Sequence, residues 1–293
     1  MRFFEKRPMV MIVLGVVGIS LSSIFVKYSA APAAVTAAWR LLWTVALMTP
    51  VVWGSGTVRR ELLGVDGKTA ALSALSGVFL AIHFVLWFES LNQTSVASST
   101  TIVCTEVIWV CLGYRLFLCG RIPGRAALAI AVTLVGSVLI AFADSGSRGH
   151  LWGDVLALLA AVAVAGYTLI GRVVRAKAST AVYTYLVYAV CALALVLTCA
   201  LQGQGLTAYG SSPVFVGLAL AVFSTILGHS IFSWCLKYFS PAFVSASKLC
   251  EPVGAAALAA VLFAQIPTAL QLLGGGLILG GVWWYSRMEG ETT

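Results

Sequence analysis

Six ionisable side chains lie inside long apolar stretches of this sequence: Arg40, His83, Glu106, His229, Lys248 and Glu251. A charged side chain at the centre of a membrane-spanning helix costs about 2.5 to 3.5 kcal/mol on insertion scales, so such groups need partners or water. Lys248 and Glu251, in the stretch SASKLCEPVGAAAL, are three residues apart, and a continuous helix would place them on one face as an ion pair. Two interpretations stay open. The pair is structural and neutralises itself, or a wet cavity exposes it to a zwitterion, with the ammonium on Glu251 and the carboxylate on Lys248.

Glu106 and Arg40 extend this set of charges. Glu106 is a candidate to bind a substrate ammonium or to carry a proton, and Arg40 is a candidate to hold Glu106 in an ion pair between helices. A guanidinium favours fixed, bidentate partners. We therefore expect a structural role for Arg40.

Two histidines occur at matching places in the chain. His83 and Trp87 are spaced i, i+4, and His229 and Ser233 repeat that spacing, which gives each of two helices a partly polar face. Aromatic side chains away from the ends of their apolar stretches extend the expected cavity lining: Trp87, Trp109, Tyr167, Tyr185 and Trp234. Such a lining suits an aromatic or apolar side chain through stacking, and a quaternary cation through cation–π attraction.

The composition requires a membrane for these elements. Of the 293 residues, 60% are hydrophobic and 10% are charged, against about 25% charged in ordinary soluble domains. A bilayer core of about 30 Å needs about 20 helical residues. Ten apolar stretches of that length are predicted, near residues 9–27, 33–53, 70–88, 95–117, 125–142, 151–171, 180–201, 213–236, 241–264 and 268–286.

The formal charge of +8 reflects topology and does not indicate a nucleic-acid partner. With a cytoplasmic N-terminus, the inside segments carry most of the basic residues: Arg2, Lys6, Arg7, Arg59, Arg60, Lys68, Arg115, Arg121, Arg125, Arg172, Arg175, Lys177, Lys237 and Arg287. The outside segments carry Lys27 and Arg148. This asymmetry follows the positive-inside rule and predicts an even number of spans with both termini in the cytoplasm.

The chain repeats itself. A shift of 146 residues lays His83 on His229 and Cys104 on Cys250, and a shift of 145 lays Lys27 on an arginine. This predicts two five-helix repeats, residues 1–145 and 146–293. Since five is odd, the second repeat enters the membrane from the opposite side. Inverted repeats are typical of secondary transporters, whose substrate lies near the midplane between them.

The chain resembles the EamA-type drug/metabolite transporter superfamily in this 5+5 plan and in the segments VTLVGSVLIA (132–141), LCEPVGAAALAAVLF (249–263) and GLILGGVWW (276–284). Within it, the aromatic content looks most like the YddG-type bacterial exporters of aromatic amino acids. The resemblance implies a basket of helices 1–4 and 6–9 around a central cavity, with helices 5 and 10 peripheral. One departure is that FLCGRIP (117–123) and FAQIP (263–267) lack the acidic residue common in the family at the ends of helices 4 and 9.

The sequence favours a transporter over an enzyme. No intramembrane protease motif or metal-ligand spacing occurs, and GVDGKT (64–69) lacks the spacing of a phosphate-binding loop, so no cofactor is expected. We expect an all-α exporter of amino acids in the bacterial inner membrane, working by alternating access with or without proton coupling. The alternative is efflux of cationic, quaternary ammonium drugs. The oligomeric state is open, with a monomer as the working expectation.

Overall fold

The computed structural model describes residues 8–94, 96–144, 151–263 and 267–289, and all regular structure in these ranges is helical. Seven of the described helical segments are long and apolar enough to cross a membrane. Each of the ten predicted stretches is occupied by helix. The ten-span count and the inversion of the halves remain predictions.

The helices of the first half follow the predicted order, with one addition. They are α2 (Pro8–Ser20), α3 (Ser22–Val26), α4 (Ala33–Gly54), α5 (Gly56–Leu63), α6 (Gly67–Gln93), α7 (Val96–Cys104), α8 (Glu106–Phe117) and α9 (Gly124–Asp144). The short helix α5 was not predicted. It follows the end of α4 directly, and the Ser55 side chain caps it by accepting a hydrogen bond from the Val58 backbone N–H.

The second half has the same general plan. Its helices are α10 (Leu151–Arg175), α11 (Thr180–Leu201), α12 (Ser212–Ala219), the π-helix η1 (Leu220–His229), α13 (Ser230–Cys235), α14 (Pro241–Lys248), α15 (Glu251–Phe263) and α16 (Ala269–Glu289). In η1, the Thr225 hydroxyl donates to the Leu220 carbonyl oxygen, five residues back, at 3.2 Å. π-helical turns inside α-helices are frequent at functional sites, and this one ends at His229.

Two spanning segments are interrupted at equivalent places. The first breaks at Thr105, between α7 and α8, and the second at Leu249 and Cys250, between α14 and α15. Pro252 explains the second break, because it has no N–H to donate to the Lys248 carbonyl four residues earlier. Both interruptions lie beside predicted functional residues.

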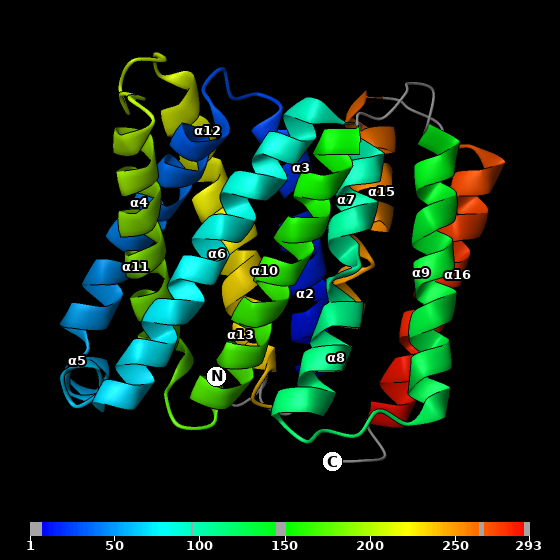
Figure 1. Ribbon diagram of the computed structural model, residues 1–293, viewed down its shortest axis with the longest axis horizontal. Coiled ribbons are helices and arrows are strands. Elements are labelled where there is room, and N and C mark those ends of the chain that lie inside the picture. The colour runs from blue at the N-terminus through cyan, green and yellow to red at the C-terminus, as the bar shows by residue number, and fades with distance from the viewer. Residues whose placement is uncertain (1–7, 95, 145–150, 264–266, 290–293) are drawn as a thin grey trace.

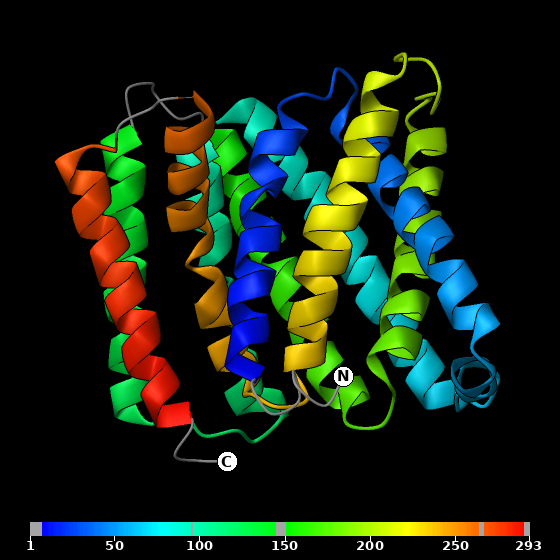
Figure 2. The same cartoon turned by 180° about the vertical axis from the view of Figure 1, so that it is seen from behind.

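The helices stand side by side as one bundle (Figures 1 and 2). Helix α2 begins, α16 ends, and the connections α8–α9, α10–α11 and α13–α14 lie at one end, together with α5. We call this the basic end, because these segments and the first turn of α6 carry Arg59, Arg60, Lys68, Arg121, Lys177 and Lys237. The α3–α4 and α11–α12 connections, and the place where α16 begins, lie at the other end, which we call the far end. The basic residues before Pro8 lie outside the described residues, and so does Arg148.

Helices α9 and α16 form a pair at one side of the bundle (Figures 1 and 2). Their backbones meet at glycines: a Cβ added to Gly136 would lie 2.5 Å from the Gly274 carbonyl oxygen, and one added to Gly274 would lie 2.6 Å from the Gly136 carbonyl oxygen. Small residues at such contacts let membrane helices approach closely. The pair contributes nothing to the cavity described below.

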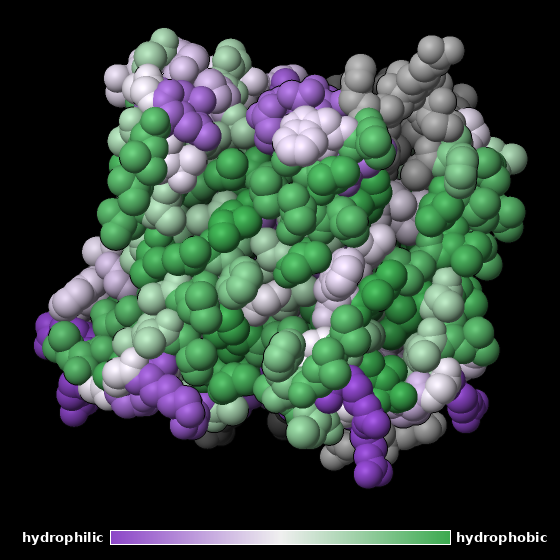
Figure 3. Space-filling model, viewed as in Figure 1, coloured by the Kyte–Doolittle hydropathy of each residue, from purple (hydrophilic) through white to green (hydrophobic). Residues whose placement is uncertain are grey.

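The visible face of the bundle is apolar across its middle, and hydrophilic side chains gather toward the two ends (Figure 3). Large hydrophobic side chains are exposed on several helices, among them Val51, Leu193 and Phe215. A soluble protein rarely exposes so much apolar surface, whereas a lipid-facing surface requires it.

Candidate functional site

The bundle holds a cavity at the level of the two helix interruptions. It contains about 480 Å³ of empty space, including its mouth. Both halves of the chain contribute to its lining: Ile19, Ser22, His83, Trp87, Val103, Cys104, Glu106, Val164, His229, Lys248 and Glu251. Six of the ten residues predicted to bind substrate are therefore brought together.

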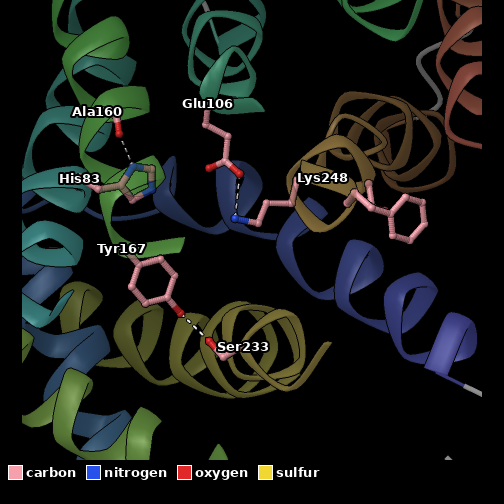
Figure 4. A network of polar contacts seen from close by, with 8 residues as sticks. His83, Glu106, Ala160, Tyr167, Ser233 and Lys248 are labelled. Atoms are coloured by element: carbon pink, nitrogen blue, oxygen red, sulfur yellow. Dashed lines mark hydrogen bonds and ion pairs between the residues drawn. The ribbon is translucent and has the colours of Figure 1, made fainter. Parts of the chain in front are cut away.

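Lys248 forms an ion pair across the cavity wall with Glu106 (Figure 4). The Lys248 Nζ lies 2.9 Å from the Glu106 Oε1, and the two side chains are only 10% and 5% exposed. The Lys248 ammonium also lies 5.6 Å from the centre of the Phe232 ring. The ion pair joins α14 to α8, and hence the second half of the chain to the first.

The predicted pairing of Lys248 with Glu251 is wrong. The prediction assumed one continuous helix, but α14 ends at Lys248 and α15 begins at Glu251. The break removes the helical register that would have brought the two side chains together. The partner of Lys248 lies 142 residues away in the sequence, and only the fold brings it near.

Glu251 is the carboxylate left without this partner. Its Oε1 atom is buried and has no hydrogen-bond partner among the described residues, while its backbone carbonyl accepts a hydrogen bond from the Ser20 hydroxyl at 3.3 Å. An unpaired buried polar atom costs about 1 to 3 kcal/mol. A ligand or water that donates a hydrogen bond to this oxygen would recover that cost.

His83 and Trp87 form an aromatic wall, with ring centres 5.9 Å apart and planes inclined by 14°. The backbone carbonyl of Ala160 fixes the His83 ring through Nδ1 at 3.0 Å (Figure 4). His229 lies opposite, 6.4 Å from His83 between ring centres. Trp87 Nε1 and His229 Nδ1 are buried and have no hydrogen-bond partner in the described part of the chain. The wall thus combines stacking surface with polar atoms that a ligand can satisfy.

Tyr167 lies next to the cavity and does not line it. Its ring meets His229 edge-on at 6.1 Å, and its hydroxyl hydrogen-bonds the Ser233 hydroxyl at 2.7 Å (Figure 4). Tyr188 bonds Ser230 in the same way at 3.0 Å. These pairs fix α10 and α11 against α13.

Arg40 is fully buried on α4 and does not pair with Glu106. Its Nε donates to the Thr225 hydroxyl at 2.7 Å and its Nη1 to the Ser22 hydroxyl at 3.3 Å. Its guanidinium lies 4.2 Å from the centre of the Phe84 ring. The interhelical ion pair with Glu106 was therefore a wrong prediction. Arg40 instead joins α4 to η1 and to α3 through hydroxyl groups, which is compatible with the expected structural role.

Three predicted residues lie away from the cavity. Tyr185 accepts a hydrogen bond from Trp53 Nε1 at 3.1 Å, and Trp234 packs against Tyr238 with ring centres 4.3 Å apart and planes inclined by 39°. Trp109 is half-buried on α8 and does not line the cavity. Their positions within the spans were predicted, but helix rotation decides which side chains face inward.

Five other lining residues were not predicted from the sequence: Ile19, Ser22, Val103, Cys104 and Val164. Ser22 lies within a hydroxyl-rich stretch of the first helix, GISLSS (18–23), and such stretches commonly pack helices together. Ile19, Val103 and Val164 carry no signal that separates them from other apolar residues. Cys104 was marked by its alignment with Cys250, although that alignment did not show which of the two faces the cavity.

Comparison with known proteins gives a family match over the second half of the chain. Residues 151–287 match the EamA-like transporter family. This match supports the drug/metabolite transporter superfamily and suggests a multi-pass membrane transporter of small molecules. No curated protein gives a significant match.

A solved structure shares the fold. A chain whose title reads only "Crystal structure of protein" superposes with a TM-score of 0.79 at 17% sequence identity, covering 98% of this chain and 99% of that one. At this identity the likeness shows the fold alone. The helical bundle is thus one that an experimental structure also adopts.

Proposed function

We propose that this chain is a secondary or facilitative exporter of amino acids and related small metabolites, most like the YddG-type exporters, that favours aromatic or apolar side chains and works by alternating access. The observation that carries the proposal is the cavity between the two halves, where an unpaired oxygen of Glu251 and the His83–Trp87 wall line one space.

The charges of the cavity favour a substrate with a primary ammonium. Lys248 and Glu106 satisfy each other at 2.9 Å, so Glu251 is the acidic group whose oxygen is left to accept a hydrogen bond. A charge-assisted hydrogen bond from an ammonium is stronger than one from a neutral donor. The substrate carboxylate then falls near the unpaired Trp87 Nε1 or competes with Glu106 for Lys248.

The aromatic wall favours a flat or apolar side chain. The nearly parallel rings of His83 and Trp87 offer a stacking surface, and Ile19, Val103 and Val164 supply apolar lining. Efflux of quaternary ammonium drugs is the second candidate, since cation–π attraction draws a cation to the same wall. A quaternary cation, however, has no N–H to donate to Glu251.

The proposed setting is the bacterial inner membrane, with the basic end and both termini facing the cytoplasm. The positive-inside rule supports this orientation, because the segments gathered at the basic end, together with the helix turns that adjoin them, carry most of the described basic residues. Substrate would enter at the basic end and leave at the far end.

Counterflow in liposomes tests the proposal. Liposomes that contain the purified protein are loaded with unlabelled phenylalanine, and their uptake of labelled phenylalanine is measured. The competitors added outside are phenylalanine, phenethylamine, N-acetylphenylalanine and a quaternary ammonium dye. We expect competition by the two primary amines and none by the N-acetyl compound. Competition by the dye alone would replace the proposal with the drug-efflux alternative.

A pair of matched variants tests the role of Glu251. Glu251→Gln keeps the shape and removes the acceptor's charge, and we expect phenylalanine counterflow to fall at least about tenfold, because the ammonium would then bond a neutral amide oxygen in place of a carboxylate. Glu89→Gln is the control, because Glu89 accepts a hydrogen bond from Gln93 outside the cavity. Equal effects of the two variants would remove Glu251 from the substrate site.

A further inference from the structure

A contact between a basic side chain and a helix carbonyl occurs twice in the bundle, at opposite ends. Lys27 Nζ, at the C-cap of α3, donates to the Leu91 carbonyl oxygen of α6 at 3.4 Å. Arg172 Nη1, in the last turn of α10, donates to the Leu236 carbonyl oxygen, at the C-cap of α13, at 2.5 Å. A shift of 145 residues carries Lys27 onto Arg172, and the 146-residue shift that lays His83 on His229 carries Leu91 onto Lys237, next to Leu236, so a similar contact occurs in both halves.

The physical reason for each contact is the end of a helix. The last carbonyl groups of a helix have no N–H partner within it, and they carry partial negative charge. A basic side chain from a neighbouring helix satisfies such a carbonyl and is attracted by the charge. In both halves, this joins the first spanning segment to the third.

The two contacts differ in strength. Arg172 also donates to the Phe239 carbonyl at 3.3 Å, and Arg175 on the same helix donates to the carbonyl oxygens of Ser233 and Ala178. Lys27, by contrast, is exposed, and among the described residues it makes one long hydrogen bond, to the Leu91 carbonyl oxygen. The first and third spanning segments are thus held together more firmly at the basic end than at the far end.

We propose that these contacts are the two latches of the transport cycle. The basic-end latch is Arg172 with the Leu236 carbonyl, and the far-end latch is Lys27 with the Leu91 carbonyl. Each latch forms when the cavity is closed at its own end and breaks when that end opens. Arg172 and Lys27 are therefore positioning residues, which set the balance between the two open states without touching substrate. The inference rests on the alternating access proposed above.

The thiol of Cys104 provides a reporter inside the cavity. The full-length chain keeps Cys104 and carries serine at the other cysteine positions: Cys111, Cys119, Cys191, Cys199, Cys235 and Cys250. A small membrane-impermeant thiol reagent is added outside intact cells or outside inverted vesicles, in the absence of substrate. The measured quantity is the ratio of the labelling rates from the two sides.

The two latch variants are expected to shift this ratio in opposite directions. Arg172→Met opens the basic end and raises the ratio of basic-end to far-end labelling about tenfold, because a hydrogen bond to a charged group commonly biases an equilibrium by that factor or more. Lys27→Met shifts the ratio toward the far end by a smaller factor, since its bond is longer and exposed. The control is Lys177→Met, which removes the charge of an exposed side chain at the basic end and leaves the ratio unchanged.

A merely structural role would not produce opposite shifts. If both variants move the ratio in the same direction, or if Arg172→Met moves it no more than Lys177→Met, the proposal is wrong. Should Arg172→Met fail to fold, Arg172→Lys keeps the charge with fewer donors, and a smaller shift in the same direction is required. Because no substrate is present, this result is independent of whether phenylalanine is carried.

Discussion

The ion pair between Lys248 and Glu106 gives the sharpest prediction about stability. Replacing Lys248 with methionine keeps most of the side-chain volume and leaves the Glu106 carboxylate, which is 5% exposed, without its partner at 2.9 Å. Removing one member of a buried pair costs about 3 to 5 kcal/mol. Because the pair lines a cavity that water can enter, we expect the lower end of that range, about 3 kcal/mol.

A third ionisable group in the cavity, Glu251, makes the stability losses of the two single variants unequal. After Glu106→Gln, Lys248 still has an acidic group, Glu251, in the same cavity, so we expect a smaller loss. After Lys248→Met, two carboxylates share the cavity and no lysine remains in its lining, so the loss is larger. The double variant removes the pair as a unit, and its stability is expected to lie above that of Lys248→Met alone.

The assay is thermal and denaturant unfolding of the purified protein in one detergent, with the double-mutant cycle giving the coupling energy between Lys248 and Glu106. We expect a coupling of about 1 to 3 kcal/mol, as found for residues in direct contact. Additive losses, or a double variant less stable than either single variant, would refute the argument that the two groups depend on each other.

Three further predictions concern other parts of the molecule. Gly136→Ala forces a Cβ to within 2.5 Å of a carbonyl oxygen of α16 and should destabilise the protein by about 1 to 3 kcal/mol in unfolding assays. The control is Gly276→Ala, where nothing lies within 4 Å of the added Cβ, and it should leave the stability unchanged or raise it. Trp87→Leu removes a stacking partner and should raise the KM for phenylalanine about two- to tenfold in counterflow while changing leucine less, and equal changes would contradict the aromatic wall. The pKa of Asp66, which caps α6 outside the membrane, is lowered by hydrogen bonds from Thr69, so its contribution to stability is present above the ordinary carboxyl pKa and is lost as the pH falls through the lowered value. Asp66→Asn should therefore flatten the loss of stability seen in melting curves between about pH 5 and pH 3.

The sequence predicted where the long helices lie, because hydropathy is a property of whole segments. It also found the cavity residues that are costly in lipid, since Glu106, His229 and Lys248 have few other reasons to lie inside a span. It failed where the answer depends on helix rotation or on a break. Trp109 and Tyr185 do not line the cavity. The helix is interrupted before Glu251, and Lys248 pairs with Glu106 in place of Glu251.

The pattern of the missed residues has a physical reason. Apolar residues such as Val103 and Val164 look the same to the sequence whether they face lipid, a helix or a cavity. The Arg40 site was missed for a related reason, because its partners Ser22 and Thr225 are hydroxyl groups, which form many alternative hydrogen bonds in membrane helices.

The ion pair of Lys248 with Glu106 joins the two halves of the chain, and each half supplies one of the two cavity histidines. A gene cut between α9 and α10 would consequently yield two fragments, neither of which holds a whole binding chamber. When the two fragments are co-expressed, they should assemble and restore counterflow. Either fragment alone, or two copies of the same fragment, should give no counterflow. Both halves are needed to line the cavity. A mutation that is compatible with the fold of one half can therefore still disrupt its contacts with the other half.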